Sequence, residues 1–161
     1  MADDAAALAA AVSSDPVTIE DRAGHSCAGG AHSYLPDGRV VCWVAPLPGA
    51  EPAGIQPAGA GVPTLRYAVD AELVDRAPPA HVAGRWGVTG DTFWRLWCAT
   101  EVVAKIVDRP IITFVTGEPV RLSPHVVEGW RVHWLTVRAD EVLVALGIGR
   151  AADAPADDAT A

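Results

Sequence analysis

LRYAVDAEL at residues 65–73 and DTFWRLWCATEVVAKIV at residues 91–107 are the two stretches that decide the fold. The first alternates loosely between apolar and polar side chains, a pattern typical of a strand. The second contains no Gly or Pro, and Thr89 or Asp91 can cap its start. It ends ahead of Pro110, because the residue before a proline disfavours the α conformation. We therefore expect a strand followed by the main helix.

Further strand signals are short and are separated by turn residues. They lie at 39–44, 111–116, 130–137 and 141–148, and the last two predict an antiparallel hairpin. Together these elements predict an α+β fold, an antiparallel sheet with one main helix packed across it. We expect flexible tails at 1–16 and 151–161, a domain at 17–150, and a Pro/Gly-rich loop at 46–63.

Length and charge narrow the class of protein. A chain of 161 residues fits one domain, and its net charge of −8 argues against a nucleic-acid binder, which needs clustered cations. We find no targeting or membrane segment in the sequence. Three cysteines, Cys27, Cys42 and Cys98, without a C-x-x-C pair predict reduced thiols and a cytoplasmic protein.

Asp70 and Glu72 end the first stretch as a D-x-E pair. Side chains two apart on a strand point to the same face, so two carboxylates can converge on one cation there. Mg²⁺ takes carboxylate oxygens, with waters and ligand phosphates completing its shell. The alternative is a solvated strand end without a ligand.

Glu101 and Lys105 lie four residues apart on the expected helix. Lys105 is the only lysine in the chain, since the other eleven of its 12 cationic residues are arginines. A lone lysine in such a background suggests that an amine is needed there. The alternative is a surface i,i+4 salt bridge worth a few tenths of a kcal/mol.

Three segments, taken in chain order, resemble the 4′-phosphopantetheinyl transferase superfamily, as a divergent, short member. The family carries an S-H-S segment running into D-G-x-V-V-x-x-V-A, a G-V-D-V-E strand end, and a W-[S/T]-x-K-E-[A/S]-x-x-K helix. The matching stretches here are AHS at 31–33 with DGRVVCWVA at 37–45, YAVDAE at 67–72, and WCATEVVAK at 97–105. The resemblance covers roughly residues 28–148.

The resemblance implies a Mg²⁺-dependent transfer of 4′-phosphopantetheine from coenzyme A to a serine of an acyl or peptidyl carrier protein. It implies that Asp70, Glu72 and Glu101 hold the metal, and that Glu101 and Lys105 are catalytic. It also implies that His32 and Lys105 contact phosphate groups of coenzyme A. Arg85, Arg95 and Arg109 flank the helix and could form a basic docking patch for the carrier, with Trp86 and Val88 adding apolar contact.

Two other functions stay open. Thr100 stands where the family has lysine, and only 31 residues precede His32; both features fit a catalytically inactive relative that binds a carrier protein or partner subunit. A metal-free structural domain is the third possibility. The short first lobe also leads us to expect a homodimer or trimer. Convergence of the three carboxylates within metal-ligation reach separates these possibilities.

Overall fold

The computed structural model describes residues 4–14, 17–25, 27, 29–53 and 65–152. Four α-helices and one 3₁₀ turn lie in these ranges: α1 (Asp4–Ser14), η1 (Arg22–Gly24), α2 (Ala80–Trp86), α3 (Gly90–Ile106) and α4 (Ile112–Val115). The strands are β1 (Thr18–Asp21), β2 (Ala31–Tyr34), β3 (Arg39–Trp43), β4 (Glu51–Pro52), β5 (Leu65–Leu73), β6 (His125–Val127), β7 (Trp130–Ala139) and β8 (Val142–Ala151).

The strands form two sheets. The larger has the order β4-β5-β8-β7-β6, and the smaller has the order β1-β3-β2. All pairs are antiparallel except β4 with β5, so the larger sheet is mixed rather than purely antiparallel. The predicted hairpin is confirmed as β7–β8, and the expected α+β class with a main helix is confirmed as well.

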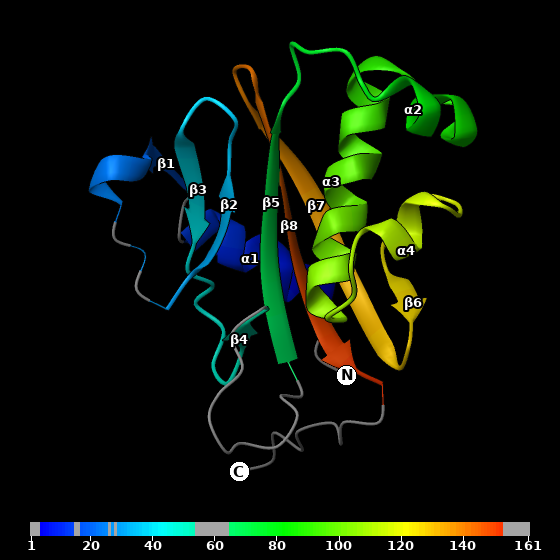
Figure 1. Ribbon diagram of the computed structural model, residues 1–161. Helices are drawn as coiled ribbons and strands as arrows, with labels where there is room; N and C mark the ends of the chain where they lie inside the picture. Colours follow the sequence, from blue (N-terminus) through cyan, green and yellow to red (C-terminus); the bar gives the residue numbers. More distant parts are fainter. Residues whose placement is uncertain (1–3, 15–16, 26, 28, 54–64, 153–161) are drawn as a thin grey trace.

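Helix α3 crosses one face of the larger sheet (Figure 1). Two glycines of β8 let it approach closely: a Cβ on Gly147 would lie 2.4 Å from Val102 Cγ1, and one on Gly149 would lie 2.4 Å from Ile106 Cγ2. Val102 and Ile106 are fully buried there, together with the rings of Phe93 and other aromatic residues. The absence of two side chains on β8 therefore sets the distance between helix and sheet.

The opposite face of the larger sheet is covered by α1 and the smaller sheet (Figure 1). Leu8 and Ala11 of α1 are buried, and Asp4 pairs with Arg150 of β8 at 3.0 Å. The structure thus differs from the expected tail at 1–16, because one apolar stripe and one ion pair dock the Ala-rich helix. On the C-terminal side, Ala151 belongs to β8, and residues 153–161 lie outside the described residues.

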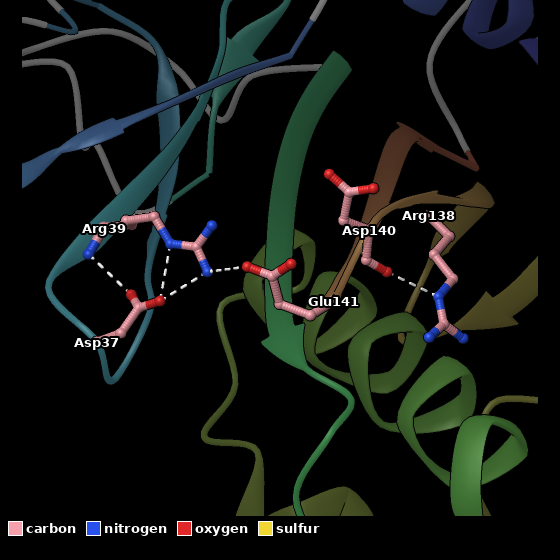
Figure 2. A network of polar contacts seen from close by, with 5 residues as sticks. All are labelled: Asp37, Arg39, Arg138, Asp140 and Glu141. Atoms are coloured by element: carbon pink, nitrogen blue, oxygen red, sulfur yellow. Dashed lines mark hydrogen bonds and ion pairs between the residues drawn. The ribbon is translucent and has the colours of Figure 1, made fainter.

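An arginine joins the turns of the two sheets (Figure 2). Arg39 Nε donates to Asp37 Oδ2 at 2.7 Å within its own turn, and Arg39 Nη2 donates to Glu141 Oε1 at 2.7 Å. Glu141 lies between β7 and β8, so this bridge ties the tip of the smaller sheet to the tip of the hairpin.

Three further expectations need correction. The apolar run 111–116 forms the short helix α4, because Pro110 starts a turn whose carbonyl accepts from the Thr113 backbone and hydroxyl, and β6 supplies the next edge strand instead. The loop expected at 46–63 contains the two-residue strand β4, and residues 54–64 lie outside the described residues. Cys27 and Cys42 are not reduced thiols; they form a disulfide with Cα atoms 6.4 Å apart.

Candidate active site

Strand β5 presents Asp70 to helix α3. Asp70 is 4% exposed and faces the α3 side together with Glu72, as the alternation of a strand requires. Lys105 reaches across from α3, and its Nζ donates to Asp70 Oδ1 at 2.8 Å and to the Val69 carbonyl at 2.9 Å. We call Asp70, Glu72, Glu101 and Lys105 the Asp70 cluster.

The ion pair with Asp70 keeps the Lys105 amine protonated. Burial lowers the pKa of Lys105, but the charge and hydrogen bond of Asp70, with help from Glu101, outweigh burial and raise it. The lysine side chain is 33% exposed, and it donates to two protein acceptors among the described residues. One N–H of the ammonium is therefore left for solvent or a ligand.

Ser33 of β2 completes the surroundings of Asp70. Its hydroxyl donates to Asp70 Oδ1 at 3.2 Å and accepts from the Ala71 backbone N–H at 3.2 Å. The second oxygen, Asp70 Oδ2, is buried without a hydrogen-bond partner of good geometry, and the Cys98 thiol of α3 is only a weak donor to the Asp70 carboxylate. An unsatisfied buried carboxylate oxygen is costly, and a cation or a donor from a ligand would satisfy it.

Glu72 pairs with Arg76, whose guanidinium lies over the Trp94 ring at 4.9 Å. Burial raises the pKa of Glu72, the charge of Asp70 adds to the rise, and Arg76 opposes it. Because the Arg76 side chain is 42% exposed, it can leave Glu72 without a large packing cost.

Glu101 is the carboxylate of the cluster without an ion-pair partner within 4.0 Å among the described residues. Burial, the charge of Asp70 and the charge of Glu72 raise the pKa of Glu101 to about 7, although Lys105 opposes the rise. The i,i+4 salt bridge between Glu101 and Lys105, the alternative that the sequence offered, is thus not formed; Lys105 pairs with Asp70 of the strand instead. The same negative charges, after burial, raise the pKa of the Cys98 thiol well above its usual range.

The three carboxylates face one region without closing on a single point. Among the described residues, the group whose ligand atoms all lie within 4.8 Å of one another is His25, Cys27 and Cys42; Asp70, Glu72 and Glu101 do not form such a group. Mg²⁺ is often bound through one or two carboxylates, with waters and phosphates as its other ligands. The oxygen donors, the unpaired Asp70 Oδ2 and the mutual repulsion of the carboxylates fit such a cation.

His32 is not brought to the Asp70 cluster. It precedes Ser33 on β2, and alternation turns its exposed side chain to the other face, where its ring lies 5.2 Å from that of Tyr34. Its predicted contact with a coenzyme A phosphate stays a prediction. Thr100 is fully buried, donates to the Leu96 carbonyl and accepts from the Val120 N–H, so it ties α3 to the following loop.

Sequence reasoning missed Ser33 and Arg76 as parts of this site. Ser33 adjoins the predicted His32, but only the packing of β2 beside β5 makes it a partner of Asp70. Arg76 lies four residues after Glu72, a spacing that carries no signal outside a helix. Trp86, expected as an apolar docking contact, is buried and cannot serve as one.

A surface hollow of about 390 Å³ lies beside the lysine, lined by Ala104, Lys105, Asp108, Arg109 and Pro110.

No helix among the described residues is long and apolar enough to cross a membrane. Comparisons of the chain with protein-family models, curated proteins and solved structures find no match. The geometry of the Asp70 cluster therefore has to support any assignment of function.

Proposed function

We propose that this protein transfers 4′-phosphopantetheine from coenzyme A to a serine of an acyl or peptidyl carrier protein. The observation that carries the proposal is the Asp70 cluster: three carboxylates and the chain's only lysine on facing sides of β5 and α3. The resemblance of residues 67–72 and 97–105 to the transferase motifs gives this cluster its chemistry.

In this proposal the metal ligands are Asp70, Glu72 and Glu101. Mg²⁺ would supply positive charge for the pyrophosphate of coenzyme A. Arg76 must leave Glu72 when the cation binds, and its exposed position permits that movement.

Lys105 would hold the anionic substrate and stabilise the charge that grows on it. Its ammonium is held by Asp70 and by the Val69 carbonyl, so it is positioned before substrate arrives. Lys105 is also one of the residues that line the adjacent hollow, and its side chain is 33% exposed.

Glu101 would accept the proton of the carrier serine. The pKa of Glu101 is about 7 without metal, and a bound cation would lower it, so the carboxylate would be ionised and able to accept a proton. The serine oxygen bonds to the β-phosphorus, the phosphorus–oxygen bond to the α-phosphate breaks, and adenosine 3′,5′-bisphosphate leaves with the electron pair.

The test is intact-mass measurement of a panel of apo-carrier proteins after incubation with the protein, coenzyme A and Mg²⁺. We expect a carrier to gain one phosphopantetheine, and Asp70→Asn to abolish the gain. Asp91→Asn is the matched control, because Asp91 is an exposed carboxylate at the start of α3, outside the Asp70 cluster; this variant should leave transfer intact. No gain with any carrier would contradict the proposal.

A second candidate is a catalytically inactive, partner-binding relative. It is favoured by the three carboxylates, which do not converge within metal-ligation reach among the described residues. It is also favoured by the two ion pairs, Lys105 with Asp70 and Arg76 with Glu72, which already compensate two of these carboxylates. This candidate predicts that a carrier binds the protein without any change in mass, and that Asp70→Asn does not alter the binding.

A further inference from the structure

A second group of reactive side chains lies on the outer face of the smaller sheet. Cys42 of β3 is directly opposite His32 of β2, and residues paired across strands point to the same face. Two described residues that follow η1 lie at this face. They are His25, whose ring lies 6.4 Å from that of His32, and Cys27, which is bonded to Cys42.

The chemistry of this group is that of a metal site. One ligand atom from each of His25, Cys27 and Cys42 lies within 4.8 Å of the other two. Imidazole nitrogen and thiolate sulfur are the ligands that Zn²⁺ takes in proteins. A disulfide alone requires no histidine, so the imidazole beside the two sulfurs calls for its own explanation.

We propose that, when Cys27 and Cys42 are reduced, these two thiolates and His25 bind Zn²⁺, and that the disulfide is the metal-free, oxidised form of the same site. Zn–S bonds of about 2.3 Å in a tetrahedral site put two sulfurs about 3.8 Å apart. The Cα atoms of the two cysteines are already 6.4 Å apart, so rotation of the side chains can provide that separation.

The surroundings of His25 support its role as a ligand. Its side chain is 13% exposed, and its Nδ1 atom is buried without a hydrogen-bond partner. Glu20 Oε2 lies 3.7 Å from this nitrogen, so Nε2 is the metal ligand in this assignment, and the carboxylate beside Nδ1 orients the ring. Gly30 leaves room for the sulfurs, because a Cβ there would lie 2.3 Å from Cys27 Sγ.

His32 provides the fourth ligand in this assignment. It is the cross-strand partner of Cys42, it lies on the same face, and its side chain is exposed and can turn. Oxidation by a disulfide such as oxidised glutathione transfers two electrons from the two thiolates, forms the Cys27–Cys42 bond, yields two reduced glutathione molecules and releases Zn²⁺.

The experiment uses the untagged full chain, reduced with a phosphine and titrated with Co²⁺ as a spectroscopic substitute for Zn²⁺. We expect one equivalent to produce a thiolate-to-cobalt charge-transfer band that Zn²⁺ then removes. Cys42→Ser and His25→Ala should lose the band, whereas His81→Ala, an exposed histidine on α2, should keep it. Glu20→Gln should weaken binding by about tenfold.

Two results would overturn the site: no band in the fully reduced protein, or a band that persists in the Cys27→Ser/Cys42→Ser double variant. If a variant unfolds, the unmutated protein still tests the site: treatment with oxidised glutathione should abolish the cobalt band, and reduction should restore it. A band that oxidation leaves unchanged would contradict the site. A cobalt spectrum unchanged by His32→Ala would overturn the assignment of the fourth ligand. Asp70→Asn should leave the band intact, which separates this site from the proposed transferase.

Discussion

The two faces of β5 bury different chemistry along the same strand. Toward α1 and the smaller sheet the side chains are apolar: Tyr67, Val69 and Ala71. Toward α3 they become charged along the strand: Ala68, Asp70 and Glu72. A buried carboxylate is tolerated when a cation is positioned against it, and Lys105 of α3 provides that cation. The comparison teaches that α3 compensates charge on β5, whereas α1 covers an apolar face and pairs its own Asp4 with Arg150 of β8.

The largest effect should come from the lysine. Lys105→Arg keeps a positive charge but cannot place a compact ammonium between Asp70 Oδ1 and the Val69 carbonyl, so we expect the transfer rate to fall by about 10²- to 10³-fold. Lys105→Ala should be worse. It should also cost about 2 kcal/mol of unfolding free energy, less than for a fully buried pair because the lysine is partly exposed.

Val69→Ala is the control from the other face of the same strand. It should cost about 2 kcal/mol of stability by opening a cavity, yet it should leave the transfer rate unchanged. Turnover and urea unfolding of the three variants separate the two effects. Unimpaired turnover in Lys105→Arg at saturating coenzyme A would reduce the lysine to a structural role.

The next largest effect concerns the close approach of α3 to the sheet. Gly147→Ala should cost about 2 to 3 kcal/mol, because the new methyl group meets the stiff side chain of Val102 and, at 3.1 Å, the His133 carbonyl. Gly84→Ala in α2 is the matched control: no atom lies within 4 Å, so it should stabilise by up to about 1 kcal/mol. Equal thermal shifts in the two variants would show that α3 does not depend on the glycine.

Sequence patterns predicted the elements that make the α3 side of the sheet. The strand at 65–73, the main helix and the β7–β8 hairpin each have a local signal of periodicity or turn chemistry. Helix α1 was missed because its docking depends on Asp4 meeting Arg150, a contact between the two ends of the described chain. Gly147 gave no signal, since only the packed helix reveals why the position lacks a side chain.

In the candidate site, too, local patterns were predictable from the sequence and tertiary contacts were not. Alternation placed Asp70 and Glu72 on one face, and helical spacing placed Glu101 near Lys105. The partner of the lysine was not predictable, because the choice between Glu101 and Asp70 depends on how α3 lies against β5. Local spacing gives candidates for an ion pair, and tertiary packing selects among them.

A smaller effect should appear in the pH dependence of stability. The pKa of Glu101 is about 7 in the folded protein, above its usual 4.5, so the folded state binds a proton more tightly than the unfolded state. Without metal, the contribution of Glu101 to stability should therefore be largest at acidic pH and should decrease as the pH rises from about 4.5 through 7. Glu101→Gln should flatten that fall, whereas Glu118→Gln, on an exposed side chain, should not.

Mg²⁺ extends the same test. Thermal melts in chelator and in Mg²⁺ should differ more at pH 8 than at pH 5, because the repulsion that the cation offsets increases when Glu101 is ionised. A melting temperature indifferent to Mg²⁺ at both pH values, with coenzyme A present, would count against a cation at the Asp70 cluster.

The smallest effect is expected at the bridge between the two sheets. Arg39 contacts Asp37 and Glu141 (Figure 2), and all three side chains are at least 30% exposed. The hydrogen bond of Arg39 lowers the pKa of Asp37; the pKa of Glu141 is lowered first by its own backbone N–H and then by Arg39. Exposed ion pairs are screened by salt, so Arg39→Gln should lower the melting temperature slightly at low ionic strength and not at high ionic strength. Hydrogen exchange should become faster at both turns that the arginine joins, whereas Arg131→Gln on β7 should change neither turn. A loss of stability as large as that of Lys105→Ala, or one that salt does not reduce, would mean that the smaller sheet is held by this bridge rather than by its buried apolar contacts with β5.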